Sequence, residues 1–275
     1  MQEEKSVLRE RAGIFAIYLV VLFINAFVDL GHKIIIQNTI FMIYGEQTQL
    51  ILTAIVNAMI LVPFILLFTI AGHLSDKFAK PHIMRWSAFA AVLITLAITY
   101  CYYQGAYKSA FGFTLLLATQ SAIYSPAKYG YIRECLKKAG LSIGNAYTSA
   151  VTLTSILLGT VFFSYLFELY LGVKEYSTPE EILLHIAPVG WVLVGLSMVE
   201  LLATFGVRFY ATKFSEVKLS VQKLITLHYL MNNIRAIKGN QIIWFSIWGT
   251  AIFWGMSQNL VAVIPALAKV NLGVT

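Results

Sequence analysis

Residues 25–37 read NAFVDLGHKIIIQ and lie inside the first long apolar segment of the chain. The polar positions of this stretch are Asn25, Asp29, His32, Lys33 and Gln37. Most of them recur every four residues, which places them on one face of a helix. Ionisable groups in a membrane-spanning helix are costly unless they face protein or a water-filled cavity. The stripe therefore predicts a functional site, although Asp29 and Lys33 can also pair with each other and simply hold helices together.

The composition indicates a polytopic membrane protein. The chain has 275 residues, of which 59% are hydrophobic and 12% are charged, and its mean hydropathy is +0.75. This charged fraction is about half of the roughly 25% found in globular proteins, which excludes a soluble fold. Cys101 and Cys135 lie in or beside apolar segments without metal-ligand spacing, so we expect packing roles. Residues 1–11 precede an apolar run too long for a signal peptide, which indicates a retained first helix.

Seven apolar segments are long enough to be transmembrane helices. They cover residues 13–38, 49–74, 82–104, 109–132, 142–171, 185–209 and 241–268. Each has at least the ~20 residues that cross ~30 Å of hydrocarbon, so we predict an all-α integral membrane fold. Their spacing predicts a six-helix bundle at 1–209, a connection at 210–240 and the start of a second bundle at 241–275. Because the chain stops soon after the seventh segment, we expect it to be the N-terminal part of a longer protein.

The basic residues indicate an orientation. Most lysines and arginines fall in the N-terminal tail and around the connections that follow the second, fourth and sixth segments. The opposite side has only Lys108, Lys174 and Lys269, together with several glutamates. The positive-inside rule then places the N-terminus in the cytoplasm. This asymmetry accounts for the net charge of +7 without a nucleic-acid partner, and we expect none.

The connection at 210–240 carries an apolar repeat at helical spacing. Its members are Val221, Leu224, Ile225, His228, Met231 and Ile234. Lysines and arginines lie between them, a pattern typical of an amphipathic helix on the anionic inner leaflet. A solvated basic linker is the alternative interpretation.

A loop motif lies between the second and third segments, where residues 72–81 read GHLSDKFAKP. It resembles the signature loop of the major facilitator superfamily, in which it accompanies conformational change. The matching positions are Gly72, Asp76, Lys77 and Lys80. Ala79 stands where the superfamily usually has Gly, and Pro81 where it often has a basic residue. We expect the glycine to allow close helix approach, the aspartate to cap a helix or pair with a cation, and the lysines to hold the loop at the surface. A plain positively charged loop is the alternative.

The fourth segment ends with TQSAIYSPAKYG at residues 119–130. Ser121, Ser125 and Lys128 share one helical face there. Gln120 and Tyr124 share the neighbouring face, and a proline between the two groups can kink the helix. In the superfamily, the first and fourth helices of each half line the central cavity. The resemblance therefore implies that this lysine and the aspartate of the first segment lie on one polar pathway, although the lysine can also snorkel to the membrane surface.

A narrower resemblance rests on four stretches. They are FVDLGHK at 27–33, GHLSDKFAK at 72–80, QSAIYSPAKYG at 120–130 and FWGMSQNL at 253–260. Together they are similar to the lysophospholipid transporter family, most of all to its branch fused to an acyl-ACP synthetase and 2-acylglycerophosphoethanolamine acyltransferase. The resemblance covers essentially this whole chain but only the first half of a transporter domain. It implies a major facilitator fold, with the six-helix N-terminal bundle and the seventh transmembrane helix.

The resemblance also implies a function. It predicts a secondary transporter that moves lysophospholipid of the 2-acylglycerophosphoethanolamine type across a bacterial inner membrane, toward the cytoplasmic leaflet, for re-acylation during phospholipid remodelling. The implied partners are this substrate, membrane lipids, and a fused or associated acyltransferase with acyl carrier protein. The expected substrate pathway consists of Asn25, Asp29, His32, Lys33, Gln120, Tyr124 and Lys128.

No catalytic motif is found in the sequence. It contains no nucleotide-binding P-loop, and no histidine is followed five residues later by the aspartate that glycerolipid acyltransferases use. We therefore expect no cofactor, no metal and no enzyme activity in this segment. Glu200, deep in the sixth segment, either pairs with a basic residue or carries a proton. The alternative functions are a superfamily exporter of small amphiphiles and a membrane anchor for a fused phospholipid acyltransferase.

Overall fold

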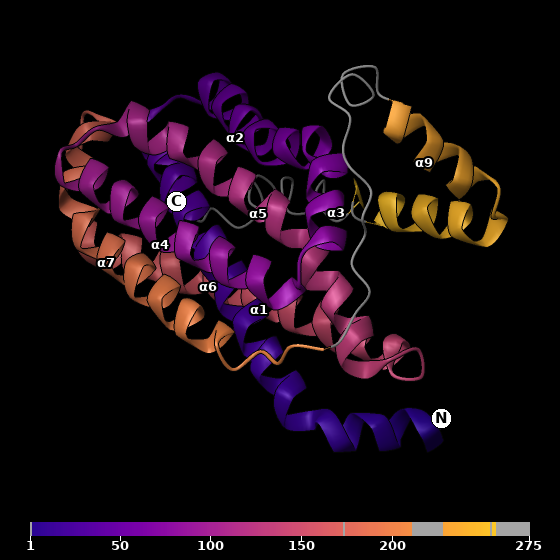
Figure 1. Ribbon diagram of the computed structural model, residues 1–275. Helices are drawn as coiled ribbons and strands as arrows, with labels where there is room; N and C mark the ends of the chain where they lie inside the picture. The colour runs from indigo at the N-terminus through magenta and orange to yellow at the C-terminus, as the bar shows by residue number, and fades with distance from the viewer. Residues whose placement is uncertain (1, 173, 211–227, 254, 257–275) are drawn as a thin grey trace. The chain divides into compact units, whose positions relative to one another are not determined.

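The computed structural model describes residues 2–172, 174–210, 228–253 and 255–256 (Figure 1). The chain divides into two compact units, Met1–Val217 and Lys218–Thr275. Within the described ranges every regular element is a helix, which confirms the all-α prediction. The division into a six-helix bundle, a connection and a second bundle stays a prediction.

Seven helices make up the described part of the first unit. They are α1 (Gln2–Ile43), α2 (Glu46–Leu66), α3 (Phe68–Lys77), α4 (Lys80–Tyr103), α5 (Tyr107–Leu136), α6 (Leu141–Leu171) and α7 (Pro179–Thr204). Among the described residues, five helices are long and apolar enough to cross a membrane: α1 from Arg11 onward, α2, α4, α6 and α7. With 30 residues, α5 has the length to span, but polar side chains interrupt its apolar sequence. The chain is therefore a multi-pass membrane protein, as its composition predicts.

The second apolar segment is not one continuous helix, contrary to the prediction for residues 49–74. The helix breaks at Leu67, where the backbone has φ −94° and ψ 0°, and α3 continues in a different direction (Figure 1). Pro63, one turn before the break, has no backbone N–H to donate. Hydropathy alone gives no sign of such a break, because the residues on both sides of it are equally apolar.

The sixth apolar segment begins earlier and ends earlier than the predicted range of 185–209. Thr178 precedes α7 and accepts a hydrogen bond from the backbone N–H of Glu181 at 3.4 Å. Pro179 occupies the first helical position, where its missing N–H costs nothing. The carboxylate of Glu181 accepts in turn from the backbone N–H of Ser177 at 3.1 Å. These capping contacts explain why the helix begins at Pro179, in a polar stretch that precedes the predicted apolar segment.

Helix α1 is the central element of the first unit. It packs mainly against α6 and α7 and also contacts α5 and α2, while α4 packs against α7 and α5. Gly31 permits this arrangement. A Cβ atom at that position would lie 2.5 Å from Cζ of Phe163 and 2.8 Å from a methyl group of Leu193.

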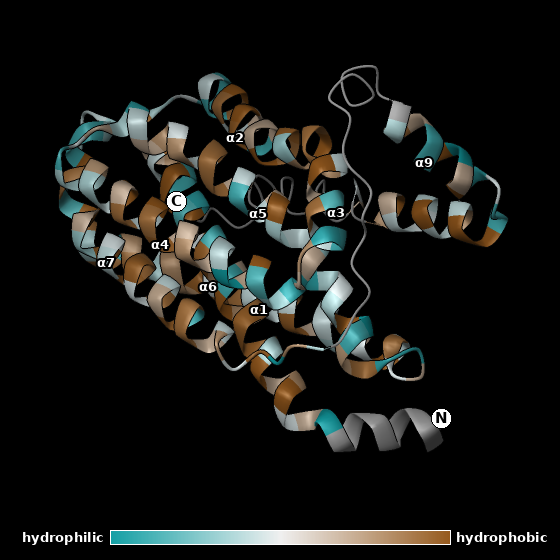
Figure 2. Cartoon of the chain, in the orientation of Figure 1, coloured by the Kyte–Doolittle hydropathy of each residue, from teal (hydrophilic) through white to brown (hydrophobic). Residues whose placement is uncertain are grey.

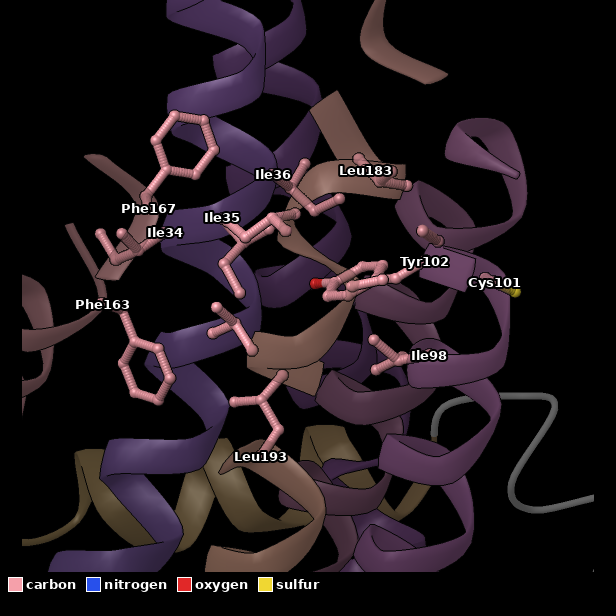
Figure 3. Packing of buried hydrophobic residues seen from close by; sticks show 14 of the residues in the cluster. Ile34, Ile35, Ile36, Ile98, Cys101, Tyr102, Phe163, Phe167, Leu183 and Leu193 are labelled. Carbon is pink, nitrogen blue, oxygen red and sulfur yellow. The ribbon is translucent and has the colours of Figure 1, made fainter. Parts of the chain in front are cut away.

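The core of the first unit consists of two apolar clusters. The larger cluster surrounds the isoleucines of α1, and Figure 3 shows Phe163 and Phe167 on one side of Ile35 and Tyr102 on the other. The second cluster includes Tyr18, Leu22, Tyr131 and Ile132. Cys101 belongs to the first cluster and Cys135 to the second, and both are free thiols, which confirms their packing roles.

Large apolar side chains also cover the outside of the first unit. Exposed examples are Leu50, Ile51, Leu61, Ile65 and Leu66 on α2 and Leu157, Val161, Tyr165 and Leu169 on α6. Figure 2 shows the hydrophobic residues spread along the membrane-length helices. In water a surface of this kind would cause aggregation, whereas in a bilayer it meets acyl chains.

The described part of the second unit contains α9 (His228–Lys238) and a helix at Gln241–Phe253. The first is strongly amphipathic and carries Arg235 and Lys238 in its last turn. Part of the predicted apolar repeat, at 221–227, lies outside the described residues, as do residues 254 and 257–268 of the seventh predicted segment. The placement of α9 on a membrane surface stays a prediction.

Candidate functional site

A cavity of about 240 Å³ lies among α1, α2, α5 and α6 in the first unit. Its polar wall consists of Asn25, Asp29, His32 and Lys33 from α1 and Thr114, Ser121 and Lys128 from α5. Apolar side chains complete the wall, among them Ile60 and Phe64 of α2 and Ile156 of α6. The predicted stripe on the first helix and the predicted lysine on the fourth segment therefore meet at one cavity.

Asp29 is held by α5. The hydroxyl of Ser121 donates a hydrogen bond of 2.6 Å to Oδ2 of Asp29. The carboxylate also interacts electrostatically with Lys128, and it forms no ion pair with Lys33. The pairing of Asp29 with Lys33 that the sequence left open is thus absent, and the aspartate interacts across the cavity instead.

Lys128 lies between aromatic rings and acidic groups. Its Nζ is 5.7 Å from the centroid of the Tyr124 ring and 5.4 Å from that of Tyr129, which allows cation–π attraction. Its backbone carbonyl accepts a hydrogen bond of 2.8 Å from the hydroxyl of Tyr18, which fixes this part of α5 against α1. The ammonium group has no ion-pair partner within the described chain, so it remains available in the cavity wall.

His32 belongs to the cavity wall, but its ring nitrogens are already engaged. Nε2 lies 3.1 Å from the carbonyl oxygen of Ala110, and Nδ1 lies 2.8 Å from the hydroxyl of Tyr102. The neutral tautomer with a proton on Nε2 satisfies both contacts, donating to Ala110 and accepting from Tyr102. The hydroxyl of Thr114 lies 3.2 Å from the same Nε2. His32 therefore ties α1 to α4 and α5 and offers no free nitrogen to a substrate.

The other two predicted pathway residues do not line this cavity. Gln120 donates a hydrogen bond of 2.9 Å to the carbonyl of Ser87 on α4, and it borders a separate, mostly apolar groove of about 680 Å³ among α3, α4 and α5. Tyr124 is buried, and its hydroxyl has no hydrogen-bond partner in the described part of the chain. Gln120 thus binds α4 and Tyr124 is buried in the core, while Ser121 and Lys128 line the cavity.

Two residues of the loop motif, Gly72 and Asp76, do not make the contacts expected from the sequence. A Cβ at Gly72 would meet no atom within 4 Å, so this glycine makes no close helix contact in the structure. Asp76 is exposed in the last turn of α3 and does not cap a helix. Lys77 is also exposed, with Nζ 5.6 Å from the centroid of the Phe78 ring.

Lys80 is the member of the motif that makes a defined contact. It forms an ion pair with Glu134 near the end of α5. A Cβ at Gly130 would lie 2.5 Å from Cε of Lys80, so this glycine leaves the space through which the lysine reaches its partner. Nearby, Nη1 of Arg11 donates a hydrogen bond of 2.7 Å to the carbonyl of Cys135. The ends of α1, α4 and α5 are joined by these contacts.

Ser121 and Glu200 belong to the site although the sequence predicts no role for the serine and no partner for the glutamate. The helical spacing of seven residues between Ser121 and Lys128 was a usable signal for the serine. The carboxylate of Glu200 is buried on α7 and interacts electrostatically with Lys128 and Asp29. No pattern within one segment could have predicted that interaction, because it joins α7 to α5 and α1.

The chain is distantly similar to curated proteins described as lysophospholipid transporters. The chain is 26% identical over 234 residues to "Lysophospholipid transporter LplT" of Escherichia coli O1:K1 / APEC, a match that covers 84% of this chain and 52% of the relative. A protein with the same description from Shigella flexneri is 25% identical over 212 residues, covering 77% of this chain and 48% of the relative. No family model and no solved structure matches the chain. The chain thus spans about half the length of the curated relatives it matches and is distantly similar to them.

Proposed function

We propose that this chain forms part of a secondary transporter that moves lysophospholipid across a bacterial inner membrane, toward the cytoplasmic leaflet. The observation that carries the proposal is a membrane cavity whose wall contains one carboxylate, Asp29, and two ammonium groups, Lys33 and Lys128, that have no ion-pair partner among the described residues. The similarity to lysophospholipid transporters supports the same substrate class. We also propose a major facilitator arrangement of the helices and re-acylation of the substrate by an acyltransferase.

The charges of the cavity are complementary to a zwitterionic headgroup of the phosphoethanolamine type. Asp29 would bind the ammonium group of the substrate, and Lys128 would bind its phosphate, with Lys33 as a second cation on the same wall. Removing charged groups from water costs several kcal/mol each, and only opposite charges or hydrogen bonds offset this cost. A polar wall of this composition lowers the barrier for a charged headgroup far more than for an uncharged lipid.

The size of the cavity suits a headgroup and not a whole lipid. Its volume of about 240 Å³ is below the roughly 300–1,000 Å³ typical of sites that enclose drug-sized ligands. The apolar side chains of α2 and α6 at its edge, such as Phe64 and Ile156, would contact the first methylenes of the acyl chain. The remainder of the chain would stay in apolar surroundings while the headgroup moves along the polar wall.

Uptake of labelled lysophosphatidylethanolamine by spheroplasts or proteoliposomes containing the full-length protein tests the proposal. We expect Asp29→Asn and Lys128→Ala to reduce uptake at least tenfold. Lys108→Ala, a change of an exposed lysine at the start of α5, serves as the matched control and should leave uptake unchanged. Normal uptake by both cavity variants would refute the mechanism. Resistance to amphiphilic drugs without any effect on lysolipid would favour an exporter instead.

A further inference from the structure

Glu200 of α7 is a buried carboxyl group outside the wall of the cavity. The residue is 1% exposed, and neither of its carboxylate oxygens has a hydrogen-bond partner among the described residues. The side-chain amide of Asn25 on α1 lies beside the carboxylate but does not complete a hydrogen bond to either oxygen. Among the described residues, the group therefore has no fully formed hydrogen bond that would stabilise a negative charge.

Three titratable side chains from two helices face Glu200. They are Asp29 of α1 and Tyr124 and Lys128 of α5. From α4, Arg85 contacts the end of α7 and the residues that follow it, and its Nε lies 3.4 Å from the carbonyl of Thr204. Within the described part of the chain, α6 adds no charged group to this cluster, because Glu168 is exposed elsewhere on that helix. One ammonium group thus serves two carboxyl groups.

The two carboxyl groups have unequal support. Asp29 accepts a hydrogen bond from Ser121 and lines the cavity, whereas Glu200 has neither advantage. Lys33 gives Glu200 little compensation, because it lies eight residues beyond Asn25, or about 12 Å along α1. Since a buried carboxylate without a completed hydrogen bond is far costlier than a neutral carboxyl group, the ionised form depends mainly on the attraction of Lys128.

We propose that Glu200 is a proton-binding site, and that occupation of Lys128 by the phosphate of a lysolipid headgroup drives proton uptake there. The inference rests on the proposed function, since it needs an anionic group that competes for Lys128. In the empty site, Lys128 is shared by Asp29 and Glu200. When the phosphate pairs with Lys128 and the substrate ammonium pairs with Asp29, Glu200 loses the attraction of the one cation that faces it in the described part of the chain. A proton from the aqueous phase then forms an O–H bond on its carboxylate.

The charge balance favours this coupling. Asp29, Glu200 and Lys128 carry a net charge of −1 when all three are ionised, and a zwitterionic substrate does not change that sum. One added proton makes the occupied cluster neutral. By linkage, substrate affinity should fall up to about tenfold for each unit of rising pH in the range where Glu200 titrates. Substrate and proton would therefore move together.

The test uses the full-length protein in proteoliposomes, with Glu200→Gln as the variant that mimics the protonated carboxyl group. We expect wild-type uptake of lysophosphatidylethanolamine to rise several-fold with an inward proton gradient, and E200Q to bind the lipid but to respond to no gradient. Glu168→Gln on α6 is the matched control and should keep the wild-type response. Glu200→Asp should keep a proton response, which separates a titratable role from a structural one.

Infrared spectroscopy provides a readout that does not depend on transport. A protonated carboxyl band should be present in the wild-type protein, absent from E200Q, and stronger after addition of lysophosphatidylethanolamine. Uptake that ignores the proton gradient, follows a sodium gradient, or retains its proton response in E200Q would overturn the inference while leaving the proposed function intact. Absence of lysolipid uptake by the wild-type protein would refute the proposed function, and with it the coupling. An identical carboxyl spectrum in wild type and E200Q would refute the proton site in either case.

Discussion

Gly31 offers the sharpest test of how the helices around the site pack. In Gly31→Ala the new Cβ would lie 2.5 Å from Cζ of Phe163, whereas carbon atoms in contact are normally about 3.5–4.0 Å apart. The Phe163 ring must therefore move by about 1 Å or more. It has little room, because the rings of Phe27 and Phe162 both have their centroids 5.2 Å from its own.

The expected magnitude follows from two opposing effects. Overpacking of a filled core costs about 1–3 kcal/mol, while replacing Gly by Ala inside a helix gains at most about 1 kcal/mol. We expect G31A to lower the free energy of unfolding by about 1–2 kcal/mol. Reversible denaturation in mixed detergent micelles, followed by circular dichroism of the purified full-length protein, measures this quantity.

Gly112→Ala is the matched control, since a Cβ at Gly112 on α5 would meet no atom within 4 Å. The control should be neutral or slightly stabilised. Phe163→Leu should partly relieve the clash, so the double variant G31A/F163L should lose less stability than the sum of the single changes. A G31A protein as stable as G112A would refute the argument that Gly31 sets the distance between α1 and its neighbours.

Three further predictions concern the site and the loop motif. Ser121→Ala removes a hydrogen bond to a carboxylate, worth about 1.5–3 kcal/mol, and should reduce lysophosphatidylethanolamine uptake in proteoliposomes, whereas Ser125→Ala should not. His32→Gln should lower the midpoint of thermal unfolding because it breaks the contacts to Tyr102 and Ala110. The KM for lysolipid should stay within about twofold of the wild-type value. A large rise in KM with normal stability would show that His32 contacts the substrate directly. Lys80→Ala leaves Glu134 without its partner and should lower the free energy of unfolding in detergent by about 1–3 kcal/mol. The double variant with Glu134→Gln should be more stable than K80A. If K80A were as stable as the wild-type protein, the ion pair would have no structural role.

The membrane helices could be predicted from the sequence because a single property, an apolar run of sufficient length, decides them. The four-residue spacing of Asn25, Asp29 and Lys33 likewise placed them on one wall, since helical geometry alone fixes that face. The apolar pattern does not show the break at Leu67, because both sides of it are equally apolar, and Pro63 is the one residue nearby whose chemistry favours a break. The start of α7 at Pro179 could have been predicted from its capping residues Thr178 and Glu181, which a search for apolar runs does not consider.

The sequence alone also does not decide which polar residues of α5 line the cavity. Gln120 and Ser121 are adjacent in sequence, yet one binds a carbonyl of α4 and the other binds Asp29 of α1. Consecutive residues on a helix differ by about 100° in direction, so a one-residue shift changes the helix that a side chain meets. The sequence shows that two polar faces exist on this helix, but only the packing of its neighbours decides which face lines a cavity.

The packing around Gly31 and the chemistry of the cluster are connected. Gly31 allows α7 to approach α1 at Leu193, and Glu200 lies seven residues further along α7, about 10 Å away on the same helix. The contact of Glu200 with Asn25 and its attraction to Lys128 both require that close approach. A side chain at Gly31 that forces α7 outward should therefore weaken the proton response of uptake as well as stability. Since G112A changes the same atoms without touching α7, the two effects should appear together in G31A and together be absent from the control.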